Sequence, residues 1–119
     1  MADNLMIMKS HFPNDYDFFP TTYNLPGDIL AFRKEFKKAQ PDTFIVKPSH
    51  DCQGRGIYLL NKFDQLKDPE SNVVAQTYID NPFLIDNLKF DLRIYVLLYG
   101  INPLKIYLFD DGLARFATN

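Results

Sequence analysis

The clearest pattern in this sequence is a period-two alternation of apolar and other side chains over residues 89–99. One set of alternate positions is apolar: Phe90, Leu92, Ile94, Val96 and Leu98. The other set begins with three charged residues: Lys89, Asp91 and Arg93. Because successive side chains of a strand point to opposite faces, this pattern predicts a long strand with one apolar face and one face that begins charged.

Two further strands are predicted downstream of this one. Residues 100–103, Gly-Ile-Asn-Pro, favour a turn into a strand over 104–109, where apolar side chains again alternate. The dipeptide Asp111-Gly112 is a strong tight-turn signal and predicts a second turn, followed by a strand over 113–117. This part of the chain should therefore form a largely antiparallel sheet.

Upstream, the pattern predicts one helix and several short strands. Asp28 is suited to cap a helix over residues 28–40, and Pro41 ends it. Apolar residues recur at helical spacing inside it: Ile29, Phe32, Phe36 and Ala39. Short strands are predicted over 43–47, 56–60 and 73–79, with a single helical turn over 62–66.

The first 26 residues are irregular in pattern, and Pro13, Pro20 and Pro26 argue against a helix there. We predict an extended N-terminal segment over residues 1–26, whose aromatic side chains dock on the rest of the chain. Residues 27–119 then form the main unit. Its fold class is α+β: a largely antiparallel sheet with one main helix near the N-terminus.

Composition places the chain among soluble globular proteins, because 46% of its 119 residues are hydrophobic and 24% are charged. A net charge of -2 argues against binding to nucleic acid by charge alone. The single cysteine, Cys52, excludes an internal disulfide, and His11 and His50 have no partners at zinc-ligand spacing. Every apolar run is too short to span a bilayer. A cytosolic protein is expected.

The segment FIVKPSHDCQGRGIYLL, residues 44–60, is the first candidate for chemistry. Two predicted strands flank a connection that contains Gly54, Arg55 and Gly56, with Lys47 at its beginning. Glycines permit close approach of the backbone to a ligand, and exposed amides with basic side chains bind phosphate oxygens. A solvated surface hairpin is the simpler interpretation of this segment taken alone.

The charged face of the long strand is the second candidate. Lys89, Asp91 and Arg93 should lie about 6 to 7 Å apart along one face. Three ionised groups are costly to bury without partners, so this face must meet water or a polar ligand. A nucleotide would suit it, with cations on phosphates and the carboxylate on a ribose hydroxyl or a metal. A solvated face with internal salt bridges explains the pattern equally well.

Two weaker candidates remain. The strand end Gln76-Thr77-Tyr78-Ile79 could present backbone groups to the edge of a purine, although an ordinary strand end is the simpler interpretation. Arg115 could bind the carboxylate of a small substrate, and simple exposure to solvent is the alternative.

Taken in order, these segments resemble the tubulin tyrosine ligase-like family of ATP-grasp ligases. The resemblance covers roughly residues 15–119 and rests on five stretches: FIVKP, GRGI, QTYI, KFDLRIYVLL and PLKIYLFDDGLARFAT. KFDLR followed by DGLARFAT at this spacing is specific, and the forms KFDLRIYVLL and GLARFAT are most similar to the polyglutamylase branch. The resemblance implies a partial ATP-grasp fold.

The resemblance also implies roles for matching positions. Lys47 would contact nucleotide phosphates, and Arg55 with Gly56 would belong to a loop that covers them. Four residues would line the adenine pocket: Gln76, Thr77, Tyr78 and Ile79. Three more would bind ATP: Lys89, Phe90 and Asp91. Two would contact substrate: Arg115 would hold the carboxylate of glutamate, and Arg93 would add a phosphate or substrate contact.

The activity implied is that of a ligase that uses ATP and magnesium to activate a carboxylate as an acyl phosphate, which an amine then attacks. The acceptor would be a glutamate side chain on a tubulin tail, and the amine would come from free glutamate. The partners implied are ATP, free glutamate and tubulin tails or microtubules, without nucleic acid or membrane. The location would be the cytoplasmic microtubule cytoskeleton, including a cilium or basal body.

The sequence departs from the family pattern in one respect. The Asp, Glu and Asn residues that hold magnesium are expected beyond residue 119, so the resemblance assigns no catalytic or metal-binding residue within the chain. We therefore expect these 119 residues to show no turnover by themselves. Two alternatives stay open. One is a non-catalytic nucleotide- or tubulin-binding module. The other is an RNA-binding sheet that stacks bases on Tyr95, Tyr99 and Tyr107, against which the acidic balance argues.

Overall fold

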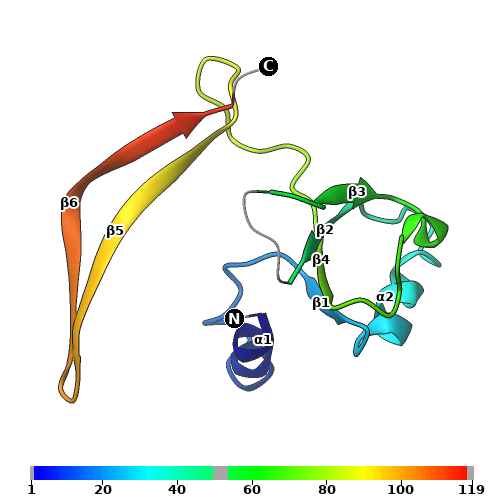
Figure 1. The fold of residues 1–119 in the computed structure, drawn as a ribbon, viewed down its shortest axis with the longest axis horizontal. Coiled ribbons are helices and arrows are strands. Elements are labelled where there is room, and N and C mark those ends of the chain that lie inside the picture. Colours follow the sequence, from blue (N-terminus) through cyan, green and yellow to red (C-terminus); the bar gives the residue numbers. More distant parts are fainter. Residues whose placement is uncertain (1, 50–53, 118–119) are drawn as a thin grey trace. The chain divides into compact units, whose positions relative to one another are not determined.

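The computed structural model describes residues 2–49 and 54–117 of the chain (Figure 1). The chain falls into two compact units, Met1–Asp80 and Asn81–Asn119. Each unit is a separate structural body with its own sheet. The predicted α+β class with antiparallel strands is confirmed. The predicted division at residue 26 stays a prediction.

The first unit consists of a four-stranded antiparallel sheet and two helices. The strand order is β1-β4-β2-β3. The elements follow one another along the chain as α1 (Ala2–His11), β1 (Thr22–Leu25), α2 (Ile29–Glu35), β2 (Phe44–Pro48), β3 (Tyr58–Leu60), the 3-10 turn η1 (Phe63–Gln65) and β4 (Val73–Thr77). The short strands and the single helical turn predicted in this region are thus confirmed, with ends that differ by one to two residues.

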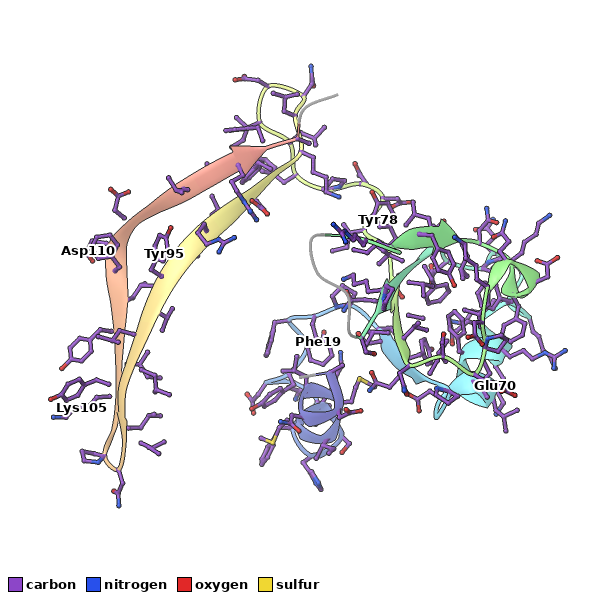
Figure 2. All side chains as sticks on the ribbon, viewed as in Figure 1. Phe19, Glu70, Tyr78, Tyr95, Lys105 and Asp110 are labelled. Carbon is purple, nitrogen blue, oxygen red and sulfur yellow. The ribbon has the colours of Figure 1, made fainter. Side chains whose placement is uncertain are left out.

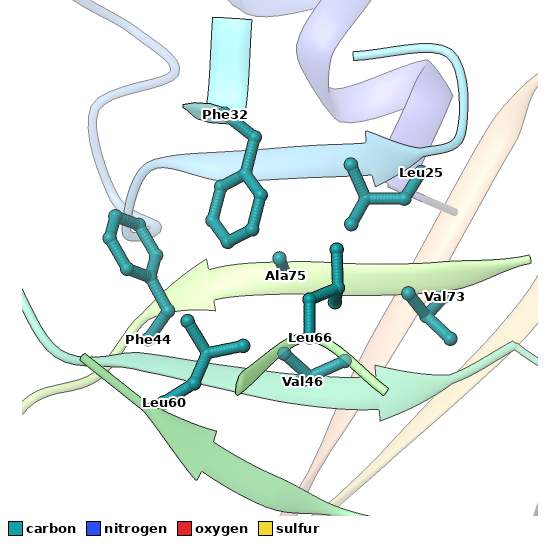
Figure 3. Packing of buried hydrophobic residues seen from close by; sticks show 8 residues of the cluster. All are labelled: Leu25, Phe32, Phe44, Val46, Leu60, Leu66, Val73 and Ala75. Carbon is teal, nitrogen blue, oxygen red and sulfur yellow. The ribbon is translucent and has the colours of Figure 1, made fainter. Parts of the chain in front are cut away.

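The hydrophobic core lies between one face of this sheet and α2 (Figure 3). Phe32 of α2 is 0% exposed, and its ring centroid lies 5.1 Å from that of Phe36 and 5.0 Å from that of Phe44. The buried residues of this core are Leu25, Phe32, Phe44, Val46, Leu60, Leu66, Val73 and Ala75. Edge-to-face rings in a dry core add attraction beyond the area they bury.

Alternation along the strands gives the sheet a second, polar face. Val46 of β2 and Ala75 of β4 point into the core, so their neighbours Lys47 and Gln76 point the other way. Residues of β1 follow the same rule, with Leu25 in the core. We use "polar face" for the side of the sheet that carries Thr22, Asn24, Lys47 and Gln76.

The second unit is a long hairpin of β5 (Phe90–Ile101) and β6 (Leu104–Phe116). The predicted turn at residues 100–103 is confirmed, because Ile101 pairs with Leu104 across it. Figure 2 shows side chains on both strands of the hairpin, among them Tyr95, Lys105 and Asp110. Apolar side chains of β5 are exposed on both faces, as at Leu92 (61%) and Leu97 (60%).

The predicted tight turn at Asp111-Gly112 is wrong. β6 runs continuously through this dipeptide, and Gly112 pairs with Ile94 while Leu108 pairs with Val96. Between these two pairs β6 has three residues, 109–111, whereas β5 has only Tyr95. The additional residues form a bulge-like irregularity within the strand and not a turn. A Cβ on Gly112 would lie 2.4 Å from the Arg93 carbonyl oxygen, so close approach of the two strands explains the glycine.

The prediction that residues 1–26 lack a helix is also wrong. Residues 2–11 form α1, and Pro13 follows the helix without interrupting it. The segment also supplies β1, which pairs with β4 from Thr22↔Gln76 to Leu25↔Val73. No proline falls within residues 2–11, so the prolines of this segment do not oppose a helix there.

The predicted helix over 28–40 is shorter than expected. α2 ends at Glu35 because the next turn tightens: the Lys37 and Lys38 amides donate to carbonyls three residues back. Asp28 occupies the predicted capping position, but its side chain accepts a hydrogen bond from the Asn24 amide at 2.7 Å and makes no cap bond to the helix. The carboxylate thus closes the turn that precedes α2.

Candidate functional site

A line of hydrogen bonds crosses the polar face of the first unit. Lys47 Nζ donates to Gln76 Oε1 at 2.9 Å, and Gln76 Nε2 donates to Thr22 Oγ1 at 2.9 Å. Strand pairing explains the meeting, because Gln76 of β4 lies opposite both Thr22 of β1 and Ile45 of β2. The predicted site residues Lys47 and Gln76, 29 positions apart in sequence, are therefore brought together.

These side chains line a cavity of about 640 Å³, a volume typical of small-molecule sites. Helix α1 borders the cavity through Asp3, whose Oδ1 accepts a hydrogen bond from Asn24 Nδ2 at 2.7 Å. Lys47 is half-buried, and its bond to a neutral amide leaves the charge of the ammonium group uncompensated by that contact. A phosphate or carboxylate would supply the missing negative charge.

The glycine-bearing connection joins β2 to β3, which pair from Phe44↔Leu60 to Val46↔Tyr58. Gly54 and Gly56 adopt φ of 75° and 69°, which favours glycine, and β3 begins only after them. Arg55 between them is exposed. Residues 50–53 of this predicted loop, with Cys52, lie outside the described residues. The phosphate-covering role of Arg55 and Gly56 stays a prediction.

The run from Gln76 to Ile79 ends β4, as predicted. Two backbone amides of this run already donate hydrogen bonds within the protein. The Thr77 amide donates to Thr21 O at 2.9 Å, and the Tyr78 amide donates to Thr43 O at 2.8 Å. A purine edge would therefore have to meet other groups of this run. Ile79 has 57% of its surface exposed, and its packing on an adenine ring stays a prediction.

The second unit brings Asp91 and Arg115 together. They face each other across β5 and β6, and Arg115 Nε donates to Asp91 Oδ1 at 2.7 Å while Nη2 donates to Oδ2. This hydrogen-bonded Arg115 guanidinium holds the pKa of the Asp91 carboxyl below its ordinary value, and the charge of Arg93 acts in the same direction. Asp91 therefore stays ionised at neutral pH.

Lys89 and Phe90 lie at the open end of the hairpin. The Ala117 amide donates to the Lys89 carbonyl at 2.7 Å, which extends the pairing of the strands. The Phe90 ring is half-buried and contacts the rings of Phe83 and Phe116 at 6.2 and 6.0 Å between centroids. Lys89, Asp91 and Arg115 line a hollow of about 240 Å³ beside it.

The family of this chain follows from comparison with known proteins. The sequence model of the tubulin-tyrosine ligase family matches residues 1–119. The chain belongs to the tubulin-tyrosine ligase family. The resemblance predicted from its motifs is thereby confirmed.

Relatives within the tubulin-tyrosine ligase family carry the name polyglutamylase. The chain is 51% identical to a probable beta-tubulin polyglutamylase of Tetrahymena thermophila, over 99% of this chain and 10% of that protein. It is 43% identical to tubulin polyglutamylase TTLL13 of Mus musculus and 42% identical to tubulin polyglutamylase TTLL6 of Homo sapiens, each over 99% of this chain. The chain spans 15% and 13% of those two relatives.

The residues expected of a family ligase fall into two groups, and each unit holds one of them. The polar face carries Lys47 and Gln76, and the hairpin carries Lys89, Asp91 and Arg115. Arg93, opposite Leu113, stands two residues along β5 from Asp91 and so shares its side of the strand. The binding of ATP by Lys47, Gln76, Lys89 and Asp91 stays a prediction, as do the substrate contacts of Arg115 and Arg93.

Magnesium is implied by the family resemblance, and the described residues do not fit a site for it. Over residues 2–49 and 54–117, no three His, Cys, Asp or Glu side chains gather closely enough to hold a metal ion. The one carboxylate of the predicted site, Asp91, is engaged by Arg115. Among the described residues, none of the helices has the length and apolar character that a membrane span requires.

Sequence reasoning missed two residues of this site, Thr22 and Asn24. Both line the cavity with Lys47, and Thr22 is only 3% exposed. The sequence did not point to them because residues 1–26 show no regular pattern of apolar and polar positions. The alternation Thr-Tyr-Asn-Leu over β1 is a signal that could have found them, since it places two polar residues on one face and two apolar residues on the other.

Proposed function

We propose that this chain carries the nucleotide-binding part of an ATP-dependent ligase that adds glutamate to tubulin tails. The observation that carries the proposal is the polar face of the first unit, where a half-buried Lys47 bonded to Gln76 borders a cavity of about 640 Å³. The membership of the tubulin-tyrosine ligase family and the names of the relatives support glutamate ligation as the reaction.

The first unit would hold the nucleotide. Lys47 would place its ammonium group on phosphate oxygens, and Arg55 with Gly56 would cover the phosphates from the adjoining loop. The run from Gln76 to Ile79 would line the adenine pocket, with Ile79 packed on the ring. For Lys89 and Asp91 of the second unit, the family resemblance implies a role in ATP binding as well.

Arg115 would hold the incoming glutamate. Its planar fork matches a carboxylate, and the Asp91 carboxylate occupies that fork in this structure. ATP would transfer its γ-phosphoryl group to a tail carboxylate with release of ADP, and the amine of glutamate would then attack the acyl phosphate with release of phosphate.

We propose microtubules of the cytoplasm, including those of a cilium or basal body, as the site of action.

The test of the proposed reaction is incubation of the full-length protein with tubulin, ATP and radiolabelled glutamate. We expect ATP-dependent incorporation of label into tubulin tails. Tubulin binding without incorporation would instead support the alternative of a non-catalytic binding module, and incorporation of tyrosine or glycine would contradict the assigned substrate.

Replacement of Arg115 tests whether this residue binds glutamate and not ATP. In the full-length protein, Arg115→Ala should raise the KM for glutamate by roughly 10- to 100-fold, because a charge-assisted pair of hydrogen bonds to the substrate is lost. The KM for ATP should change much less. Steady-state kinetics with each substrate varied in turn measures both values, and Arg33→Ala, at an exposed arginine of α2, is the control. An equal rise in both constants would count against this role.

A further inference from the structure

Thr22 is a buried polar side chain for which the family resemblance gives no role. It is 3% exposed and stands on the polar face, away from the hydrophobic core. Its hydroxyl donates to the Pro20 carbonyl at 2.8 Å and accepts from Gln76 Nε2 at 2.9 Å. Both the donor and the acceptor function of the hydroxyl are therefore used.

This arrangement decides which way the carboxamide of Gln76 points. A carboxamide has a donating end and an accepting end, and rotation by half a turn exchanges them. Because the Thr22 hydrogen is directed at Pro20 O, the hydroxyl can only accept from Gln76. The amide nitrogen must face Thr22, so the amide oxygen faces Lys47 Nζ, which it meets at 2.9 Å.

An ammonium group only donates hydrogen bonds, so a reversed carboxamide would present it with a second donor and repel it. The orientation of Gln76 therefore determines whether Lys47 is held at the cavity. The bonds run in one direction, from Lys47 through Gln76 and Thr22 to the backbone at Pro20.

We propose that Thr22 is a positioning residue for the nucleotide site, which fixes the carboxamide of Gln76 and through it holds the ammonium group of Lys47 toward the phosphates. The inference rests on the proposed function, since it takes Lys47 to be the phosphate contact. Thr22 itself need not touch the nucleotide. Its effect is to fix Lys47 before the nucleotide arrives, which lowers the cost of ordering a flexible side chain on binding.

The test is Thr22→Val in the full-length protein, because valine keeps the shape of threonine and removes the hydroxyl. We expect the KM for ATP to rise about 10-fold, as for loss of one buried hydrogen-bond partner, while the KM for glutamate stays within about twofold. Thr22→Ser keeps the hydroxyl and should restore the wild-type KM. Thr21→Val makes the same change at the exposed neighbouring residue and should have no effect.

A purely structural role is separated by a double-mutant cycle. In a Gln76→Ala background, Thr22→Val should raise the KM for ATP no further, because the link to Lys47 is already broken. Additive effects, or failure of Thr22→Ser to restore the KM, would overturn the proposal. Should Thr22→Val not fold, Thr22→Ala removes the same hydroxyl without a branched replacement and serves in the same cycle.

The outcomes also distinguish this inference from the proposed function. If Lys47→Ala raises the KM for ATP and Thr22→Val does not, only the positioning role fails. If the wild-type protein shows no ATP-dependent activity and no ATP binding, the proposed function fails together with it.

Discussion

Lys47→Ala in the full-length protein should lower kcat/KM for ATP by roughly 10- to 100-fold and leave the fold intact. The expected size follows from loss of a hydrogen bond to a charged group, about 1.5–3 kcal/mol, at a residue that projects from the polar face and away from the core. Steady-state glutamylation kinetics measures the activity, and circular dichroism of the same sample checks the fold.

Lys37→Ala is the matched control for this variant. Lys37 follows α2 and is exposed, so its replacement removes the same charge without touching the polar face. It should leave kcat/KM within about twofold of the wild-type value. Similar losses in Lys37→Ala and Lys47→Ala would show that net charge, and not a contact in the cavity, carries the effect.

Phe32→Ala should produce the largest loss of stability, about 3–5 kcal/mol in the free energy of unfolding. Phe32 is fully buried between α2 and the sheet, and its ring contacts those of Tyr23, Phe36, Phe44 and Phe63. Alanine would leave a cavity where four rings now meet. Urea unfolding of the full-length protein, followed by circular dichroism, measures the change.

Leu30→Ala, on the same helix, is the control for the core. Leu30 is 75% exposed, so its truncation removes little buried surface and should change stability by no more than about 0.5 kcal/mol. A Phe32→Ala variant that unfolds at the same urea concentration as Leu30→Ala would contradict the position assigned to the core.

Elements with long or regular patterns could be predicted from the sequence. The alternation over residues 89–99 is long enough to define β5, and Gly-Ile-Asn-Pro marks the turn after it. In β2, the order Phe-Ile-Val-Lys places Phe44 and Val46 in the core and Lys47 on the other face. In each case local pattern and tertiary packing agree, which is the condition for reading a fold from a sequence.

Elements that depend on distant partners could not be predicted. β1 has only four residues, and its strand conformation depends on pairing with β4 some 50 positions away. At Asp111-Gly112 a dipeptide typical of turns serves a different purpose, because the strand beside it approaches closely at the Arg93 carbonyl. A local signal cannot distinguish a turn from an irregularity in a strand.

The same distinction applies to the candidate site. Family resemblance named Lys47, Gln76, Asp91 and Arg115 one at a time, and the structure adds that they form two bonded pairs, Lys47–Gln76 and Asp91–Arg115. The pairing of Gln76 with Thr22, 54 positions apart, follows only from the order of strands in the sheet. No sequence motif identifies Thr22, because its proposed role depends on that strand order.

The proposed function requires that Lys47 of the polar face lies beside the phosphates of bound ATP. An acyl phosphate derivative of ATP, which transfers its acyl group to amines close to bound phosphates, tests it in the full-length wild-type protein. Peptide mass spectrometry should find Lys47 labelled, with labelling suppressed by excess ATP and Lys37 left unmodified. Equal labelling of Lys47 and Lys37, unaffected by excess ATP, would contradict the claim.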